Sequence, residues 1–136
     1  FDFSHHLTPY RQYPLTDDLT ITPVPIKHSR MTFGYILQGY RDSLVYLSDC
    51  DGVGPESAQM IRDANPKAVI VDCSFPPETG RNHLSLDRAH TLAETLDARL
   101  YLTHIGHDLS NHLMDHPLDP EGALFLTHDG LTFHLD

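Results

Sequence analysis

The chain has 136 residues, and its nine Lys and Arg are outnumbered by nineteen Asp and Glu, which gives a formal net charge of −10 at pH 7. This balance argues against nucleic acid as the main partner, because phosphate backbones are bound by clusters of basic side chains. The length allows at most one domain, and no apolar run reaches the roughly 18 residues of a membrane span. Eleven histidines are the unusual count, since histidine is the commonest metal ligand.

The two cysteines indicate the cellular compartment, and the first residue indicates whether the sequence is part of a longer chain. Cys50 and Cys73 lie far apart, and neither belongs to a CxxC pair. We therefore expect a reducing cytoplasm rather than a disulfide framework. The sequence begins at Phe1, without the basic start and apolar centre of a signal peptide. We expect it to be a segment of a longer chain.

Short apolar segments between turn residues predict β-hairpins in the first third of the chain. Residues 1–13 are interpreted as an edge strand followed by a loop. Pro23 and Pro25 lack the backbone N–H that an internal strand uses, so Leu19–Ile26 is expected at a sheet edge or as an extended segment. Two further strands are expected at Thr32–Leu37 and Leu44–Leu47.

The pattern then changes to alternating helices and buried strands. Pro55-Glu56 suits the first turn of a helix, since proline needs no N–H partner there and an acid favours the positive helix end. Asn65-Pro66 ends this helix. Apolar side chains at every position of Ala68–Val71 predict a strand covered on both faces, which ends at Asp72.

Two further helices and three further strands are expected after residue 84. Arg99–Thr103 is predicted as a buried strand, and Leu109–Met114 as a short helix. Ala123–Thr127 and Leu131–Leu135 are expected to pair around an Asp-Gly turn. The order of elements predicts an α/β layer with helices on one face of a sheet. Ser85 can cap the second helix, whose apolar stripe consists of Leu86, Ala89, Leu92, Ala93 and Leu96.

Ionisable side chains stand where three of the predicted strands end, namely Asp49, Asp72 and His104. Open α/β sheets bind their ligands beyond the carboxyl ends of the strands. His28, just before a strand start, adds a fourth polar position. Imidazole and carboxylate together suit a divalent metal such as Zn²⁺ or Mn²⁺, and two metals roughly 3.5–4 Å apart need a bridging carboxylate.

Several segments, in the same order, resemble the metallo-β-lactamase superfamily, and within it the PhnP family of phosphodiesterases that accompany carbon–phosphorus lyase. The resemblance implies an α/β fold that is the C-terminal half of a metallo-β-lactamase-like αββα sandwich, with residues 1–136 as one partial domain. The HxHxDH signature and the cysteine group of the family's first half do not occur here. The matching segments are His28–Tyr35, Leu47–Asp49, Asp72–Pro77, Arg81–His83 and Leu102–His107.

The same resemblance implies a role for each matching residue. His28 would ligate one ion of a binuclear Mn or Zn centre, Asp49 would bridge both ions, and His104 would ligate the other. His83 would lie beside the phosphate, as a general acid or as a phosphate clamp. His107 would join three cysteines in a separate structural zinc site.

Each role has a simpler alternative that the residues alone leave open. A histidine at a strand end can bond to backbone groups, and an acid in a turn such as Asp49 often does the same. Asp51 could replace Asp49 as the ligand if the register differs. His83 follows a loop and could be a surface histidine. Asp72 is interpreted as a structural carboxylate that supports ligands rather than as a ligand itself.

The activity that the resemblance implies is hydrolysis of 5-phosphoribosyl 1,2-cyclic phosphate to ribose 1,5-bisphosphate, in phosphonate catabolism. The partners would be a small phosphorylated sugar and a second copy of the chain in a homodimer, with no nucleic acid and no membrane. Alternatives are another superfamily hydrolase, a tRNA 3′-processing endonuclease, or an inactive half-domain. The endonuclease is disfavoured because the chain is acidic and because Thr103–Asp108 lacks a THxSxRY-like pattern.

Overall fold

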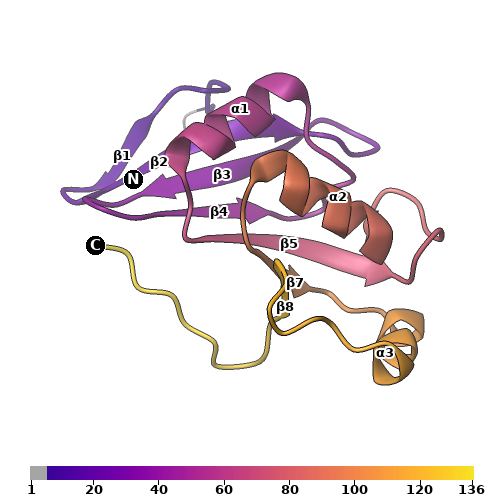
Figure 1. The fold of residues 1–136 in the computed structure, drawn as a ribbon. Helices are drawn as coiled ribbons and strands as arrows, with labels where there is room; N and C mark the ends of the chain where they lie inside the picture. Colours follow the sequence, from indigo (N-terminus) through magenta and orange to yellow (C-terminus); the bar gives the residue numbers. More distant parts are fainter. Residues whose placement is uncertain (1–5) are drawn as a thin grey trace.

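The computed structural model describes residues 6–136, in which one mixed sheet carries helices along one of its faces (Figure 1). The strand order is β1-β2-β3-β4-β5-β7-β8, and the short β6 pairs with β5. None of the helices in this part of the chain has the length and apolar character of a membrane span. The strands are β1 (Tyr13–Thr16), β2 (Leu19–Ile26), β3 (Thr32–Gln38), β4 (Ser43–Leu47), β5 (Ala68–Phe75), β6 (Leu84–Ser85), β7 (Leu100–Thr103) and β8 (Leu124–Leu126).

The first four strands form an antiparallel meander, which confirms the predicted hairpins. Strand β2 lies between β1 and β3, although it contains two prolines. β1 pairs only with Leu19–Ile21, so Pro23 and Pro25 lie beyond it and pair on one side, with β3. Half of β2 is therefore free of a neighbouring strand on one side, where the carbonyl oxygen of Pro23 accepts from the N–H of Tyr10 and that of Pro25 from Ser57 Oγ. The prediction of an edge strand and a loop over residues 1–13 includes positions 1–5, which lie outside the described residues. Within the described residues, the first strand begins at Tyr13.

The second half of the sheet is parallel and brings the carboxyl ends of three strands to one edge. Leu47 of β4, Val71 of β5 and Leu102 of β7 form one row across the sheet. Strand β5 does not end at Asp72, as the sequence predicts, but continues to Phe75, because β6 pairs with its last residues. Asp72 consequently lies inside a strand and is 2% exposed.

Helices α1 (Pro55–Ala64) and α2 (Leu86–Leu96) cover one face of the sheet (Figure 1). The first begins at a proline and ends at Asn65, whose left-handed backbone (φ 47°) terminates the helix as predicted. Each large apolar side chain buried here stabilises the fold by roughly 1.5–3 kcal/mol. The predicted stripe of α2 is buried at all five positions, Leu86, Ala89, Leu92, Ala93 and Leu96.

The other face of the sheet carries half-exposed aromatic side chains. In β4, Val45 and Leu47 point to the helices and are fully buried, whereas Tyr46 between them is 39% exposed. On this second face Tyr101 stacks on Phe125, with ring centroids 5.1 Å apart. A helix layer on one face and an apolar sheet surface on the other is one half of an αββα sandwich, which confirms the predicted fold class.

The predicted C-terminal hairpin is wrong. β8 runs parallel to β7, and Leu131–Leu135 forms no strand. The chain does turn at Gly130 (φ 87°), but it then runs back along the sheet (Figure 1). Phe133 packs edge-on against Tyr101 at 4.9 Å between ring centroids, and this apolar contact takes the place of pairing with β8. Helix α3 (His107–Asp115) begins two residues before the predicted Leu109.

Candidate functional site

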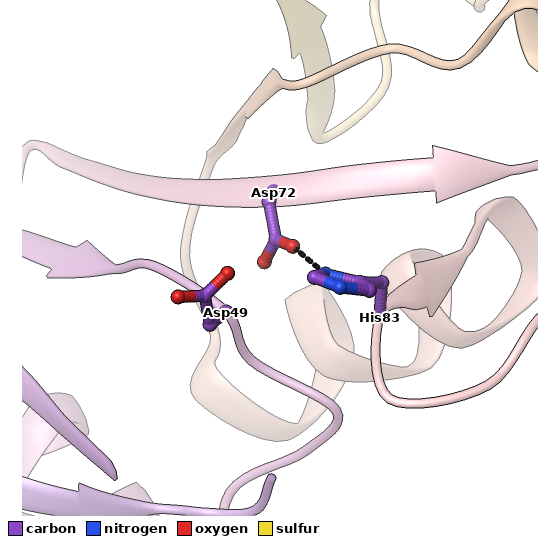
Figure 2. Close-up of side chains that lie close together, drawn as sticks. All are labelled: Asp49, Asp72 and His83. Carbon is purple, nitrogen blue, oxygen red and sulfur yellow. Dashed lines mark hydrogen bonds and ion pairs between the residues drawn. The ribbon is translucent and has the colours of Figure 1, made fainter. Parts of the chain in front are cut away.

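Three side chains converge at the carboxyl edge of the parallel strands (Figure 2). Asp49 follows β4 by two residues, Asp72 lies in β5, and His83 ends the loop that leads to β6. One possible ligand atom from each lies within 4.8 Å of the others. Two carboxylates and an imidazole of this kind can bind a divalent metal or transfer protons.

Asp72 supports this site rather than offering a free ligand. Its Oδ2 accepts a hydrogen bond from His83 Nδ1 at 2.5 Å, and its Oδ1 accepts one from the backbone N–H of Cys50 at 2.9 Å. Both oxygens of a nearly buried carboxylate are therefore engaged, as burial of a charge requires. Asp72 orients His83 and anchors the loop that carries Asp49, which agrees with its interpretation as a structural carboxylate.

The pairing with Asp72 fixes which nitrogen of His83 is available. Nδ1 donates a hydrogen bond to the carboxylate, so Nε2 is the nitrogen that remains available to a substrate or a metal. The side chain is 35% exposed, and a surface histidine without partners is excluded. This carboxylate–imidazole pair is the feature that the sequence analysis missed, because β6 has only two residues.

His28 is oriented by the same loop. Its Nδ1 donates to the carbonyl oxygen of Asn82 at 3.0 Å, and its ring lies edge-on to that of His83, with centroids 5.7 Å apart. A metal-binding histidine typically donates one ring N–H to a carbonyl or carboxylate and binds the metal through the other nitrogen. His28 has this arrangement, with Nε2 as the available atom.

His104 occupies the matching position just beyond the end of β7. It follows Leu102 by two residues, as Asp49 follows Leu47, and the row shared by these strands places β5 between them. Two interstrand spacings, roughly 10 Å, therefore separate the two backbones. Within residues 6–136, the cluster of close ligand atoms does not include His104.

The backbone is left-handed at three points of the site, at Asp49 (φ 53°), Asn82 (φ 62°) and His104 (φ 56°). Such conformations are unfavourable for residues other than glycine and concentrate at functional sites. At His104 the conformation is held by Ser74, whose Oγ donates to the His104 carbonyl oxygen at 3.0 Å. Gly106 passes so close to Ser74 that a Cβ there would collide with its carbonyl oxygen.

His107 is the first residue of α3 and is exposed. It belongs to no cluster of three potential ligands in the part of the chain that the structure describes. The structural zinc site implied by the resemblance stays a prediction.

Cys50 and Cys73 are both buried, and neither belongs to a group of potential metal ligands in the described residues. Burial raises the pKa of both the Cys50 and the Cys73 thiol to about 12, and the nearby Asp72 carboxylate adds to both shifts. A thiol with this pKa is protonated at neutral pH, whereas metals bind the thiolate. The close group of potential metal ligands in residues 6–136 is therefore formed by carboxylates and an imidazole, those of Asp49, Asp72 and His83.

A cavity of about 860 Å³ lies at the opposite, amino end of the parallel strands, with Lys67 and Arg99 in its lining. None of the candidate ligands lines it. Because α/β sheets bind ligands at the carboxyl ends of their strands, the size of this cavity does not make it the functional site.

The fold of this chain is similar to that of several solved structures. The chain is 29% identical to a diphosphatase from the PhnP family, with a TM-score of 0.72 over 96% of this chain and 49% of that one. Human tRNase Z, short form, is 18% identical, with a TM-score of 0.64 over 92% of this chain and 46% of that one. Zn²⁺-bound PqqB from Methylobacterium extorquens is 14% identical, with a TM-score of 0.63 over 95% and 55%.

The chain thus spans about half the length of these proteins. No curated protein gave a significant match. Residues 4–105 match the family model described as beta-lactamase superfamily domain. This match agrees with the fold and with the edge of the sheet at which the ionisable residues gather. The chain therefore belongs to the beta-lactamase superfamily domain family.

Proposed function

We propose that the full-length protein is a metal-dependent phosphodiesterase that hydrolyses 5-phosphoribosyl 1,2-cyclic phosphate to ribose 1,5-bisphosphate. The observation that carries the proposal is the Asp72–His83 pair beside Asp49. The pair can supply a proton at one defined atom, next to a carboxylate that can bind metal. The likeness over 96% of the chain to a protein described as a diphosphatase from the PhnP family supports a phosphorylated substrate.

In the proposed reaction water adds to phosphorus, and the bond from phosphorus to the sugar oxygen breaks. The sugar oxygen leaves with a proton from Nε2 of the His83 imidazolium, the proton that the attacking water loses restores this imidazolium, and the product is a phosphate monoester. Asp72 holds the Nδ1 proton throughout, so Nε2 is the nitrogen that exchanges protons with the substrate. His83 thereby avoids the formation of a free alkoxide.

The ligands proposed for the metals are His28, Asp49 and His104, in addition to residues that these 136 do not include. When bound, Mn²⁺ or Zn²⁺ would lower the pKa of water and neutralise phosphate charge. The fixed Nδ1 of His28 supports this assignment, because it leaves Nε2 with a lone pair.

A diphosphate is the second candidate substrate, since the PhnP-family neighbour is described as a diphosphatase. Hydrolysis of a diphosphate releases phosphate, which is a much weaker base than a sugar alkoxide and therefore leaves with less need of a proton. Tight orientation of His83 by Asp72 favours the phosphodiester, because its leaving sugar oxygen does need one. The tRNA endonuclease activity is not favoured, given the net charge of −10.

Other features implied by the resemblance belong to the same proposal. The protein would be a cytoplasmic homodimer with a small phosphorylated sugar as substrate. His107 would complete a structural zinc site with cysteines outside these 136 residues.

The test compares His83→Ala with the unchanged full-length protein on the ribosyl cyclic phosphate. We expect kcat to fall by roughly 10²-fold or more, the usual contribution of a general acid, with metal content unchanged by elemental analysis. His90→Ala, an exposed position on α2, is the matched control. Unchanged turnover in His83→Ala would remove His83 from the mechanism. If a substrate panel shows a preference for diphosphates, a diphosphate would replace the phosphodiester as the proposed substrate.

A further inference from the structure

Arg88, in the first turn of α2, binds three partners around the site. Its Nη2 donates to the carbonyl oxygen of His83 at 2.8 Å, and its Nε donates to Ser85 Oγ at 3.0 Å. Its Nη1 pairs with the carboxylate of Asp51. The guanidinium is a rigid planar fork, so one side chain fixes the segment of His83 relative to the loop that follows β4.

This contact closes a ring of hydrogen bonds around the site. The backbone N–H of Asp51 donates to the carbonyl oxygen of Lys27 at 2.8 Å, and Lys27 donates in return to Gly52 at 2.8 Å. The next residue, His28, donates to the carbonyl of Asn82, which precedes His83. The segments that carry His28, Asp49 and His83 are thereby joined in a closed circuit, and the Arg88–Asp51 ion pair is its charged link.

We propose that Arg88 is a positioning residue that sets where His83 lies relative to Asp49. The inference rests on the proposed function, in which His83 protonates the leaving oxygen. Asp72 fixes the ring of His83, whereas Arg88 fixes its backbone through the carbonyl oxygen. A displacement of about 1 Å in a reacting group can cost roughly 10²-fold in rate.

Because Arg88 is partly exposed, its effect on the reaction can be measured separately from any effect on folding. The side chains of Arg88 and Asp51 are 38% and 30% exposed, so water can solvate the groups that lose their partner. Removal of Arg88 should therefore leave a folded protein whose loop of His83 is less well fixed.

The test uses two phosphodiesters in the full-length protein. Bis-p-nitrophenyl phosphate releases a stable phenolate and needs little proton donation, whereas the ribosyl cyclic phosphate releases a sugar oxygen that needs it. We expect Arg88→Ala to lower kcat roughly 10-fold on the cyclic phosphate and less than about 2-fold on the phenyl ester, with KM unchanged. Asp51→Ala should give the same pattern, and the double variant should be no worse than either single one.

The matched control is Arg62→Ala, because Arg62 also donates to a backbone carbonyl, that of Thr95 at 2.6 Å, but does so between α1 and α2. If Arg88→Ala does not fold, Arg88→Lys is used for the same comparison of the two substrates, because lysine keeps the positive charge but lacks the planar guanidinium. An equal loss on both substrates, or a rise in KM with kcat unchanged, would overturn the positioning role.

His83→Ala, measured in parallel, separates the two proposals. If it shows no preference between the leaving groups, the proposed function fails and the role of Arg88 fails with it. If His83→Ala is selective and Arg88→Ala is not, only the inference about Arg88 fails.

Discussion

His83 Nδ1 lies 2.5 Å from Asp72 Oδ2, while the other oxygen of the same carboxylate accepts a hydrogen bond from the backbone of Cys50. Cys50 is the residue after Asp49. A single buried side chain in β5 therefore places both the proposed proton donor and the loop of the proposed bridging ligand.

Asp72→Asn should lower kcat on the ribosyl cyclic phosphate by roughly 10- to 10³-fold. The amide oxygen can still accept from Cys50, but the carboxylate that fixes His83 is lost. The measurement is steady-state kinetics together with metal content, which should not change. Asp63→Asn, which alters an exposed carboxylate bonded to Gln59 on α1, is the control. A parallel loss of metal would instead make Asp72 a ligand.

His28→Ala should reduce the metal content of the full-length protein. The hydrogen bond to Asn82 leaves Nε2 of His28 available, and an affinity loss of at least about 10- to 100-fold is expected when a ligand is removed. Elemental analysis after dialysis measures the effect, with His134→Ala as a comparison. Full metal occupancy in His28→Ala would contradict the assignment.

Gly106→Ala should destabilise the fold by about 1–3 kcal/mol, because the new methyl group meets the carbonyl oxygen of Ser74. The matched control is Gly54→Ala, where no atom lies within 4 Å of the added methyl group. Denaturant unfolding of both variants gives the comparison. Equal stability of the two variants would show that β5 and the chain after His104 can separate without cost.

The Cys73 thiol should be unreactive in the native protein and should make stability depend on pH. Burial raises its pKa from 9.0 to about 12, so above pH 9 the unfolded chain loses this proton before the folded one does. The contribution is fully present below pH 9 and is lost as pH rises towards 12. Unfolding free energies across this range should fall less steeply in Cys73→Ala. Rapid labelling of the native thiol at pH 7 would argue against its burial.

The isolated 136 residues should bind metal weakly and hydrolyse no bis-p-nitrophenyl phosphate. They supply Asp49, His28 and His104, but not the HxHxDH signature. Elemental analysis and a phosphodiesterase assay test this prediction, and robust turnover would refute it.

Much of the fold follows from local patterns, and the pairing at the site does not. Apolar residues throughout Ala68–Val71 and the five-residue stripe of α2 predict the parallel strand and the helix that covers it. The last part of β5 depends instead on Leu84 and Ser85, two residues too short for any periodicity. Asp72 therefore appeared to end a strand, and its contact with His83 was not predicted. The terminal hairpin failed for a similar reason, since Phe133 packs against distant Tyr101.

The short strand β6 has a consequence for how such a protein could change its substrate. It ties the end of the loop after Phe75 back onto β5, so His83 is held independently of how long that loop is. Residues 76–81 could then lengthen, shorten or change charge while the Asp72–His83 pair stays in place. Under the proposed function, this loop could therefore vary without loss of proton transfer by His83.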